Sequence, residues 1–170
     1  TTDYFKCSIF IHRCTYPVLM PFSQEAISWR ELQLHDSPTP AFLSFSRVPR
    51  APLALVLGWA FSEPRNVRKY ASLIQGPMHV VHCSASAKEL FIGSSGRALA
   101  RSLAAAVEAE FPRTTYPHLY TTEPRSLLLS SAPRLRAAAY VFSNNGLFLL
   151  RHLRALSLLT VDALLLDSCP

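Results

Sequence analysis

Short apolar runs alternate with amphipathic stretches from residue 51 to the end of the chain. Four of these runs have the length and continuity of strands that are buried on both faces, at residues 52–57, 78–83, 137–142 and 161–166. Between them, apolar residues at helical spacing predict three helices, at residues 64–75, 95–111 and 146–157. This alternation predicts an α/β protein with a mostly parallel sheet and helices on both of its faces.

The first 50 residues have a different pattern, because closely spaced prolines and serines follow residue 16. We expect loops with one or two strands there, one of them at Tyr4–His12, and a short helix near Glu25–Leu34. A second Pro-rich stretch, at residues 112–134, predicts a surface insertion. The chain therefore divides into a poorly defined N-terminal segment, 1–50, and an α/β domain, 51–170.

Composition and charge narrow the class of protein. With 49% apolar and 16% charged residues, the 170-residue chain has enough apolar side chains for the core of one globular domain. The formal net charge is +6, but the arginines are scattered. A nucleic-acid surface requires clustered basic residues, so we expect no nucleic-acid partner.

The sequence shows neither a membrane-spanning segment nor a signal peptide. No apolar run reaches the ~18 residues of a membrane-spanning helix. Lys6, His12 and Arg13 interrupt the N-terminal apolar stretch, which therefore does not read as a signal peptide. Because the sequence does not begin with Met, we expect it to be a fragment of a longer chain.

Neither the cysteines nor the histidines form a pattern typical of a metal site. The four cysteines lack C-x-x-C spacing, which favours free thiols in a reducing compartment over a disulfide framework or a zinc site. His79 and His82 lie three residues apart on a predicted strand, so their side chains should point to opposite faces. We therefore expect no metal and no cofactor.

The stretch "AYVFSNNGLFLL" joins a predicted strand directly to a predicted helix at Ser143. A serine at such a turn has the geometry of a nucleophile elbow, in which the sharp turn lifts the hydroxyl above the sheet edge. The helix N-terminus beneath it favours developing negative charge. The amides of Asn144 and of Trp59 or Ala60, in the loop after the strand at 52–57, are the candidate oxyanion hole.

Two observations keep a second interpretation of Ser143 open. The consensus G-x-S-x-G is not met, because Val141 and Asn145 occupy the glycine positions and glycine follows one place late, at Gly146. Ser143 and Asn144 are also favoured residues at helix N-termini. A capping role for the pair is therefore the alternative to a catalytic one.

Four short motifs follow one another in order over residues 52–170. They are an L-G-W strand end, a K-Y pair in the next helix, an F-S-N-x-G turn and a D-S-x-P segment, at residues 57–59, 69–70, 142–146 and 167–170. In these motifs the sequence resembles the transmembrane protein 53 family, also called the domain of unknown function 829 family.

The resemblance implies a partial α/β-hydrolase fold, with the C-terminal strands missing from this chain, and Ser143 as the nucleophile. Members of that family are described as nuclear-envelope or membrane-associated proteins that restrain bone-morphogenetic-protein signalling through SMAD factors. The resemblance therefore implies a location at the nuclear envelope or nuclear outer membrane, with the cytoplasm as the alternative, and allows peripheral association with a membrane.

The remaining triad members separate two function classes. A hydrolase triad runs Ser, then Asp or Glu, then His along the chain. The histidine after Ser143 is His152, which lies in the same predicted helix and should not reach the serine. Asp167 is a candidate acid, with capping of the following turn as its alternative role.

The first function class is a regulator with a degenerate hydrolase site that binds a signalling protein. The second is a serine esterase or acyl hydrolase, in which Ser143 attacks a small acyl substrate and the histidine lies beyond residue 170. In either class we expect the chain as given to be inactive, because a serine hydroxyl is a poor nucleophile without a general base.

Overall fold

The computed structural model describes most of the chain after residue 27. The described residues are 28–35, 37, 39–59, 62–74, 77–86, 93–121 and 134–167. The strand expected at Tyr4–His12 lies outside them, as does Ala60.

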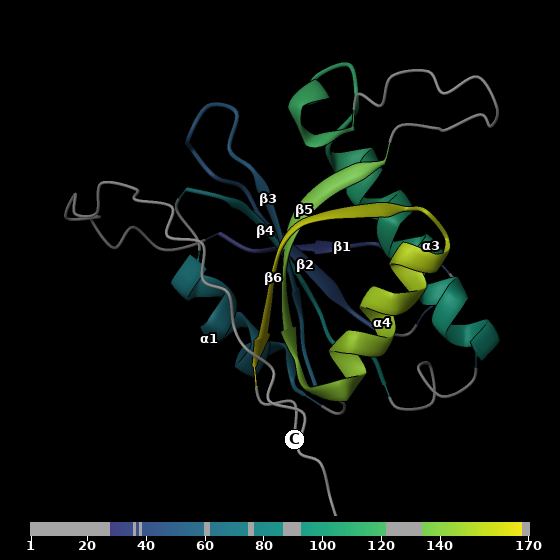
Figure 1. The fold of residues 1–170 in the computed structure, drawn as a ribbon. Coiled ribbons are helices and arrows are strands. Elements are labelled where there is room, and N and C mark those ends of the chain that lie inside the picture. The colour runs from purple at the N-terminus through teal and green to yellow at the C-terminus, as the bar shows by residue number, and fades with distance from the viewer. Residues whose placement is uncertain are drawn as a thin grey trace, which may run out of the picture.

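Six strands form one twisted sheet (Figure 1). They are β1 (Arg30–Leu32), β2 (Ala41–Ser44), β3 (Leu53–Leu57), β4 (His79–Cys83), β5 (Leu135–Phe142) and β6 (Leu159–Asp167). Their order across the sheet is β1-β2-β4-β3-β5-β6. β4, β3, β5 and β6 run parallel, whereas β2 is antiparallel to β4 and β1 is antiparallel to β2. The predicted α/β class with a mostly parallel sheet is confirmed.

Helices cover both faces of the sheet. Helix α1 (Pro64–Ile74) packs on one face, over β3 and β4, and α3 (Gly93–Glu110) and α4 (Ser143–Ala155) pack on the other (Figure 1). Every residue of β3 and β4 is buried, which explains why these strands lack an alternating polar pattern. Among the helices of the described residues, none is both long and apolar enough to cross a lipid bilayer.

The prediction of a short helix near Glu25–Leu34 is wrong for the described part of that stretch, because Arg30–Leu32 forms the strand β1. Glu31 is the partner of Phe42 in the antiparallel pair with β2. Pairing with a neighbouring strand overrides the weak local preference of so short a segment, and the local sequence does not reveal that neighbour.

The later elements lie where the apolar pattern predicted them, but several of their ends differ by two or three residues. Helix α4 begins at Ser143 rather than at Gly146, and β6 runs from Leu159 to Asp167 rather than from 161 to 166. The first turn of α4 is polar and so carries no apolar periodicity. Its N–H groups need no partner within the helix, which is why polar residues are suited to that turn.

Tyr120 fixes the described part of the Pro-rich stretch to the domain. Residues 112–121 contain the short 3-10 helix η1 (Pro117–Leu119), and Tyr120 forms an isolated β-bridge with Leu135. The Tyr120 hydroxyl donates a hydrogen bond of 2.5 Å to the Phe111 carbonyl, and both side chains are buried. Residues 112–121 therefore pack against the domain, whereas 122–133 lie outside the described residues.

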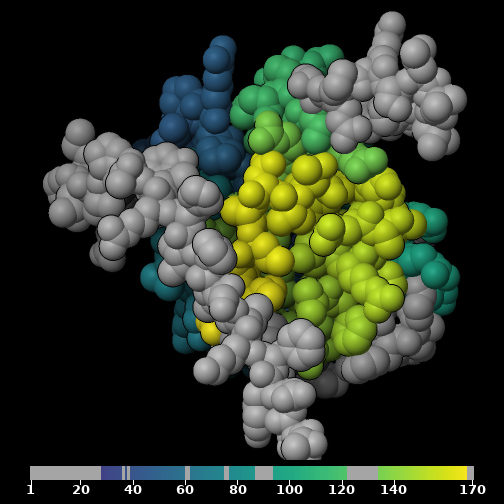
Figure 2. Space-filling model, in the orientation of Figure 1, coloured from purple at the N-terminus to yellow at the C-terminus, as the bar shows by residue number. Residues whose placement is uncertain are grey.

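Strand β6 ends the described sheet on the side of β5. Figure 2 shows β6 on the molecular surface, beside α4. Leu164, Leu165 and Leu166 are 49%, 51% and 43% exposed. Since successive side chains of a strand point to opposite faces, β6 presents apolar side chains on both of its faces.

Candidate active site

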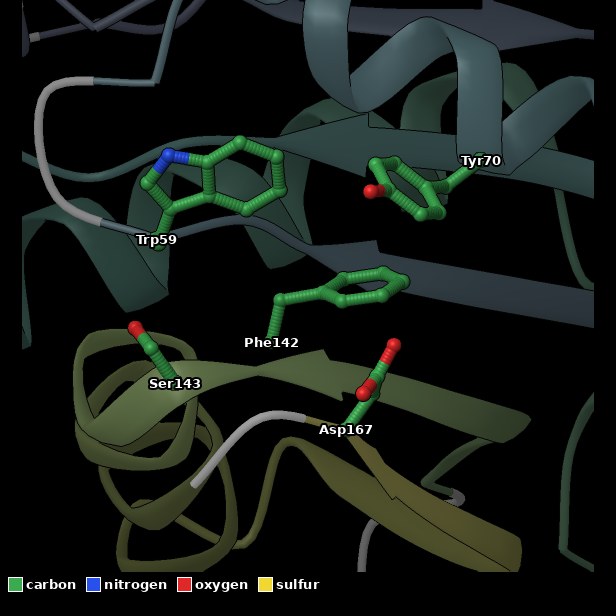
Figure 3. A pocket seen from close by; sticks show the side chains of 5 residues that line it. All are labelled: Trp59, Tyr70, Phe142, Ser143 and Asp167. Atoms are coloured by element: carbon green, nitrogen blue, oxygen red, sulfur yellow. The ribbon is translucent and has the colours of Figure 1, made fainter. Parts of the chain in front are cut away.

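A pocket of about 250 Å³ opens at the carboxyl ends of β3, β5 and β6. It is lined by Trp59, Tyr70, Phe142, Ser143 and Asp167 (Figure 3). Trp59 follows β3, Phe142 and Asp167 end β5 and β6, and Tyr70 comes from α1. The chain leaves β3 for β4 on one side and later reaches β5 on the other. The pocket therefore lies where the strand order reverses, the usual position of a ligand in an open α/β sheet.

The backbone of Ser143 is in the left-handed region. Its φ is 61°, whereas Phe142 before it is extended, at φ −105° and ψ 123°. A left-handed backbone costs a residue with a Cβ atom about 1–2 kcal/mol, and such strain is concentrated at functional sites. The sharp change of direction turns the chain from β5 into α4 within one residue.

A role of Ser143 in capping helix α4 does not explain the left-handed backbone of this residue. Phe142 occupies the N-cap position and makes no side-chain capping bond. The Ser143 Oγ accepts a hydrogen bond from the N–H of Asn145, but this contact is long, at 3.4 Å. A capping residue normally has an extended backbone, so capping leaves the positive φ of Ser143 without a reason.

Gly146 lets α4 begin close to the end of β3. A Cβ atom at this position would lie 2.6 Å from the Leu57 carbonyl oxygen and 3.0 Å from Cγ1 of Val141. The first contact is with backbone that cannot swing aside, so a side chain here would push the helix away from the sheet. Gly146 thus supplies the close approach for which the consensus motif uses a glycine one residue earlier.

Hydrogen bonds to the end of β4 hold the loop that carries Trp59. The Gly58 N–H donates to the Cys83 carbonyl at 2.8 Å. Ser62 Oγ lies 2.7 Å from both the Trp59 carbonyl oxygen and Ser84 Oγ. Because a hydroxyl has one hydrogen, Ser62 donates to the carbonyl and accepts from Ser84. These bonds fix the backbone from which the Trp59 indole reaches the pocket.

The structure describes two of the three amides expected to form an oxyanion hole. Asn144 is the second residue of α4, and the N–H groups of the first helical turn have no acceptor within the helix. That N–H and the helix dipole can therefore stabilise an anion. Trp59 lines the same pocket as Ser143. Ala60 lies outside the described residues, so the structure gives no position for its amide.

Three aromatic rings form one wall of the pocket. The ring centroid of Tyr70 is 5.8 Å from that of Trp59 and 4.8 Å from that of Phe142, with interplanar angles of 84° and 48°. The rings of Trp59 and Phe142 are 6.1 Å apart at 75°. In Figure 3, Ser143 and Asp167 lie on either side of Phe142. Asp167 is the partner of Phe142 in the β5–β6 pair, so both side chains project from the same face of the sheet.

No histidine of the described residues lines this pocket. His152 lies on α4, as expected, and its pKa is lowered by burial and by the nearby charges of Arg97 and Arg151. Arg97 belongs to α3, so His152 lies near that helix, and it is not among the residues that line the pocket of Ser143. His79 and His82 point to opposite faces of β4, as their spacing predicted: the ring of His79 contacts Phe111, which directly follows α3, and His82 lies near the charge of Arg68 on α1.

Tyr70 and Phe142 were not predicted as pocket residues. Val67, Tyr70 and Ala71 are spaced at i, i+3 and i+4 along this helix, so the sequence predicts that all three lie on its buried face. In the structure Val67 and Ala71 are buried, but Tyr70 is 42% exposed, and its ring contacts those of Trp59 and Phe142 at the pocket. The signal that could have found both aromatic residues is their position, one next to the candidate nucleophile and one in the helix after the Gly58-Trp59 loop.

The chain is therefore an α/β protein whose candidate site is a pocket at the strand ends. This pocket contains a serine and a carboxylate. Within the described residues, no group of three or more His, Cys, Asp or Glu side chains is placed to hold a metal ion. No protein-family model matches the chain, and no curated protein and no solved structure matches it significantly.

Proposed function

We propose that this protein has an α/β-hydrolase fold and that Ser143 is the nucleophile of a serine hydrolase acting on esters or other acyl compounds. The observation that carries the proposal is the left-handed backbone of Ser143 at the turn from β5 to α4, in a pocket at the strand ends. In a nucleophile elbow the serine is on such a strained turn, and a second oxyanion donor comes from the loop between the third strand and the first helix. Trp59 is in the corresponding loop here.

In this reaction Ser143 Oγ attacks the acyl carbon while its proton passes to a general base. The oxygen of the acyl group becomes negatively charged, and the N–H groups of Asn144 and of the Trp59 loop stabilise it at the start of α4. The bond to the leaving group then breaks and the leaving group takes the proton. Water attacks the acyl-serine and releases the acid. Asp167 would orient the base from the end of β6.

The general base is the part of this machinery that the described residues do not supply, because no histidine among them lines the pocket. That observation favours a second candidate function, in which the protein is a regulator that keeps the fold and the pocket but has no hydrolase activity. The family resemblance also favours this candidate, with a signalling protein as the partner.

Chemical rescue by an added base distinguishes the two functions. We expect a fluorophosphonate probe to label the 170-residue chain slowly and to label it at least about tenfold faster when imidazole is added, since a general base contributes about 10²–10⁴-fold. The labelled peptide should contain Ser143, and Ser143→Ala should abolish labelling. Ser157→Ala is the matched control, because Ser157 is exposed, follows the other end of α4 and also has a positive φ of 54°.

Three outcomes are informative. Rescue by imidazole that requires Ser143 and not Ser157 supports the hydrolase. Labelling that is equal in Ser143→Ala contradicts it. Absence of labelling with imidazole, in a chain whose circular dichroism shows it to be folded, supports the regulator.

We also propose, from the four motifs alone, that the chain belongs to the transmembrane protein 53 family and acts at the nuclear envelope. The test is the position of the fluorescently tagged chain in cells. A rim around the nucleus supports this proposal, and an even cytoplasmic signal contradicts it.

A further inference from the structure

A second pocket, which we call the Arg50 pocket, lies at the other end of the sheet from Ser143. Arg50 comes shortly before β3, whereas Trp59 of the Ser143 pocket follows the same strand. The Arg50 pocket therefore lies at the amino end of β3, between the β2–β3 loop and the turn that follows α3 (Figure 1). Its volume is about 530 Å³, and the described residues that line it are Arg50, Thr114, Thr115, Tyr116, Pro117 and His118.

Arg50 occupies a backbone position that does not suit an arginine. The N–H of Ala51 donates to the Val48 carbonyl at 3.2 Å and closes a turn, and the φ of Arg50 is 55°. Since Pro49 is at the second position of this turn and the positive φ is at the third, the turn is of type II, which favours glycine or asparagine at the third position. A residue with a Cβ atom is strained there, and such strain is concentrated at functional sites. The strain indicates a function for the Arg50 side chain.

The charge of Arg50 is not neutralised by the described residues. No carboxylate among them forms an ion pair with Arg50. The last turn of α3 carries two carboxylates, and both have other partners. Glu108 pairs with Arg113, and Glu110 pairs with Arg30. Because none of the described residues that line the Arg50 pocket is acidic, the pocket carries a positive charge.

His118 joins the two sides of the pocket. Its Nε2 lies 3.2 Å from the Ala51 carbonyl oxygen, and because a carbonyl only accepts, Nε2 donates. This bond fixes the residue after Arg50 to the turn at residues 114–118. That turn is itself closed by two backbone hydrogen bonds to the Pro112 carbonyl, of 2.9 and 2.8 Å. The arginine and the hydroxyl groups therefore line one prearranged site and not two independent loops.

A guanidinium and two hydroxyls are donors that suit a phosphate group. Arginine binds phosphate oxygens through paired hydrogen bonds, and the hydroxyls of Thr114 and Thr115 can donate to a further oxygen. The volume of about 530 Å³ lies within the ~300–1,000 Å³ that is usual for small-molecule sites. A bare anion would fill only part of this space, and an organic group attached to the phosphate has room next to Tyr116 and Pro117.

We infer that the Arg50 pocket binds a small soluble phosphomonoester. Arg50 holds the phosphate, Thr114 and Thr115 add hydrogen bonds, and the strained turn is retained because it presents the arginine to the pocket. The Ser143 pocket is lined by other residues, so this inference does not rest on the proposed hydrolase function. Ser143→Ala should bind the ester as the parent does, whatever its effect on phosphonate labelling.

Isothermal titration calorimetry of the 170-residue chain with glycerol 3-phosphate tests the inference. We expect saturable binding of one ester per chain, no binding of glycerol, and weaker binding of sulfate at the same ionic strength. Glycerol lacks the charge, and sulfate has the charge without the organic part. Vesicles that contain phosphatidic acid carry the same phosphomonoester on a membrane surface, so they distinguish a soluble ligand from a lipid.

Two substitutions separate the charge of Arg50 from its backbone strain. Arg50→Gln removes the charge and keeps the Cβ atom, so it should weaken binding at least about tenfold and leave the melting temperature unchanged. Arg50→Gly should weaken binding as much but raise the melting temperature of the ligand-free chain, because glycine adopts the positive φ without strain. The matched control is Arg101→Gln, since Arg101 is an exposed arginine of α3 that does not line the pocket.

Binding that is lost in both Arg50 variants and kept in Arg101→Gln supports the inference. No saturable binding of glycerol 3-phosphate overturns it. Equal weakening in Arg101→Gln also overturns it, because binding would then follow the net charge of the chain. Sulfate that binds as tightly as the ester would leave an adventitious ion only. Binding to phosphatidic-acid vesicles in place of the soluble ester contradicts a small-molecule site and assigns the phosphomonoester to a lipid.

Discussion

Replacing His82 by phenylalanine is expected to make the protein more resistant to unfolding by acid. His82 is 1% exposed on β4, where its ring stacks on Phe42 at 5.0 Å and meets Trp29 edge-on at 4.9 Å. Its Nε2 is buried without a hydrogen-bond partner. Burial, and secondarily the charge of Arg68, lower the pKa of His82 from 6.5 to about 4.

The direction and size of the effect follow from these two pKa values. The imidazole of the folded protein stays neutral down to about pH 4, whereas that of the unfolded chain takes up a proton below about pH 6.5. Acid therefore favours the unfolded chain, and the stability present above pH 6.5 is lost as the pH falls through the folded pKa. With a difference of about 2.5 units, the loss due to His82 is about 2 kcal/mol at pH 5 and about 3 kcal/mol below pH 4.

Urea unfolding at pH 7.5 and at pH 5 measures this loss as a change in the free energy of unfolding. His82→Phe keeps a flat ring next to Phe42 and should reduce the loss by about 2 kcal/mol. His35→Phe, at an exposed histidine, is the control and should behave like the parent. His79 and His152 also have lowered pKa values, and they act in the same direction in all three proteins. A His82→Phe protein that loses as much stability as the parent would show that protonation of His82 is not a cause of the acid sensitivity.

Three further predictions concern the pocket and the sheet edge. Gly146→Ala should lower the free energy of unfolding by about 1–3 kcal/mol in urea, since its Cβ would meet the Leu57 carbonyl at 2.6 Å; an unchanged midpoint would show that α4 is not held that closely. Ser143→Gly should be more stable than Ser143→Ala by about 1 kcal/mol in thermal melts, because glycine adopts the positive φ without strain; equal stability would mean that this backbone is relaxed. Leu165→Lys should reduce concentration-dependent association in analytical ultracentrifugation, because it charges the exposed apolar strand β6. Leu73→Lys, at an 81% exposed leucine of α1, is the control, and the same decrease in both variants would assign association to general hydrophobicity.

The sequence predicted the secondary structure well where all residues of an element are buried. β3 and β4 were predictable because every one of their residues is buried, so that these strands have to be largely apolar. The amphipathic pattern of α1 was equally clear, since Val67 and Ala71 face the core and polar residues surround them. The position of Ser143 at a strand-to-helix turn followed from these two kinds of pattern alone.

The sequence was uninformative where a contact distant along the chain decides the outcome. β1 exists because β2 lies beside it, and its three residues carry no periodicity of their own. The low pKa of His82 depends on Trp29 and Phe42, which come from outside its strand. The aromatic wall likewise joins a loop, a helix and a strand end, and no spacing along the chain relates the three.

The glycine that follows the turn at Ser143 illustrates both cases. The consensus keeps the residue two places before the serine small, but Val141 occupies that place and is buried in the core at 1% exposure. Its Cγ1 lies 3.0 Å from where a Cβ of residue 146 would be, and the end of β3 approaches the same point. The bulk of Val141 on the strand is thus matched by the absence of a side chain at Gly146 on the helix. What the turn requires is one close approach between α4 and the strands beneath it, and the motif is one of several ways for a sequence to satisfy that requirement.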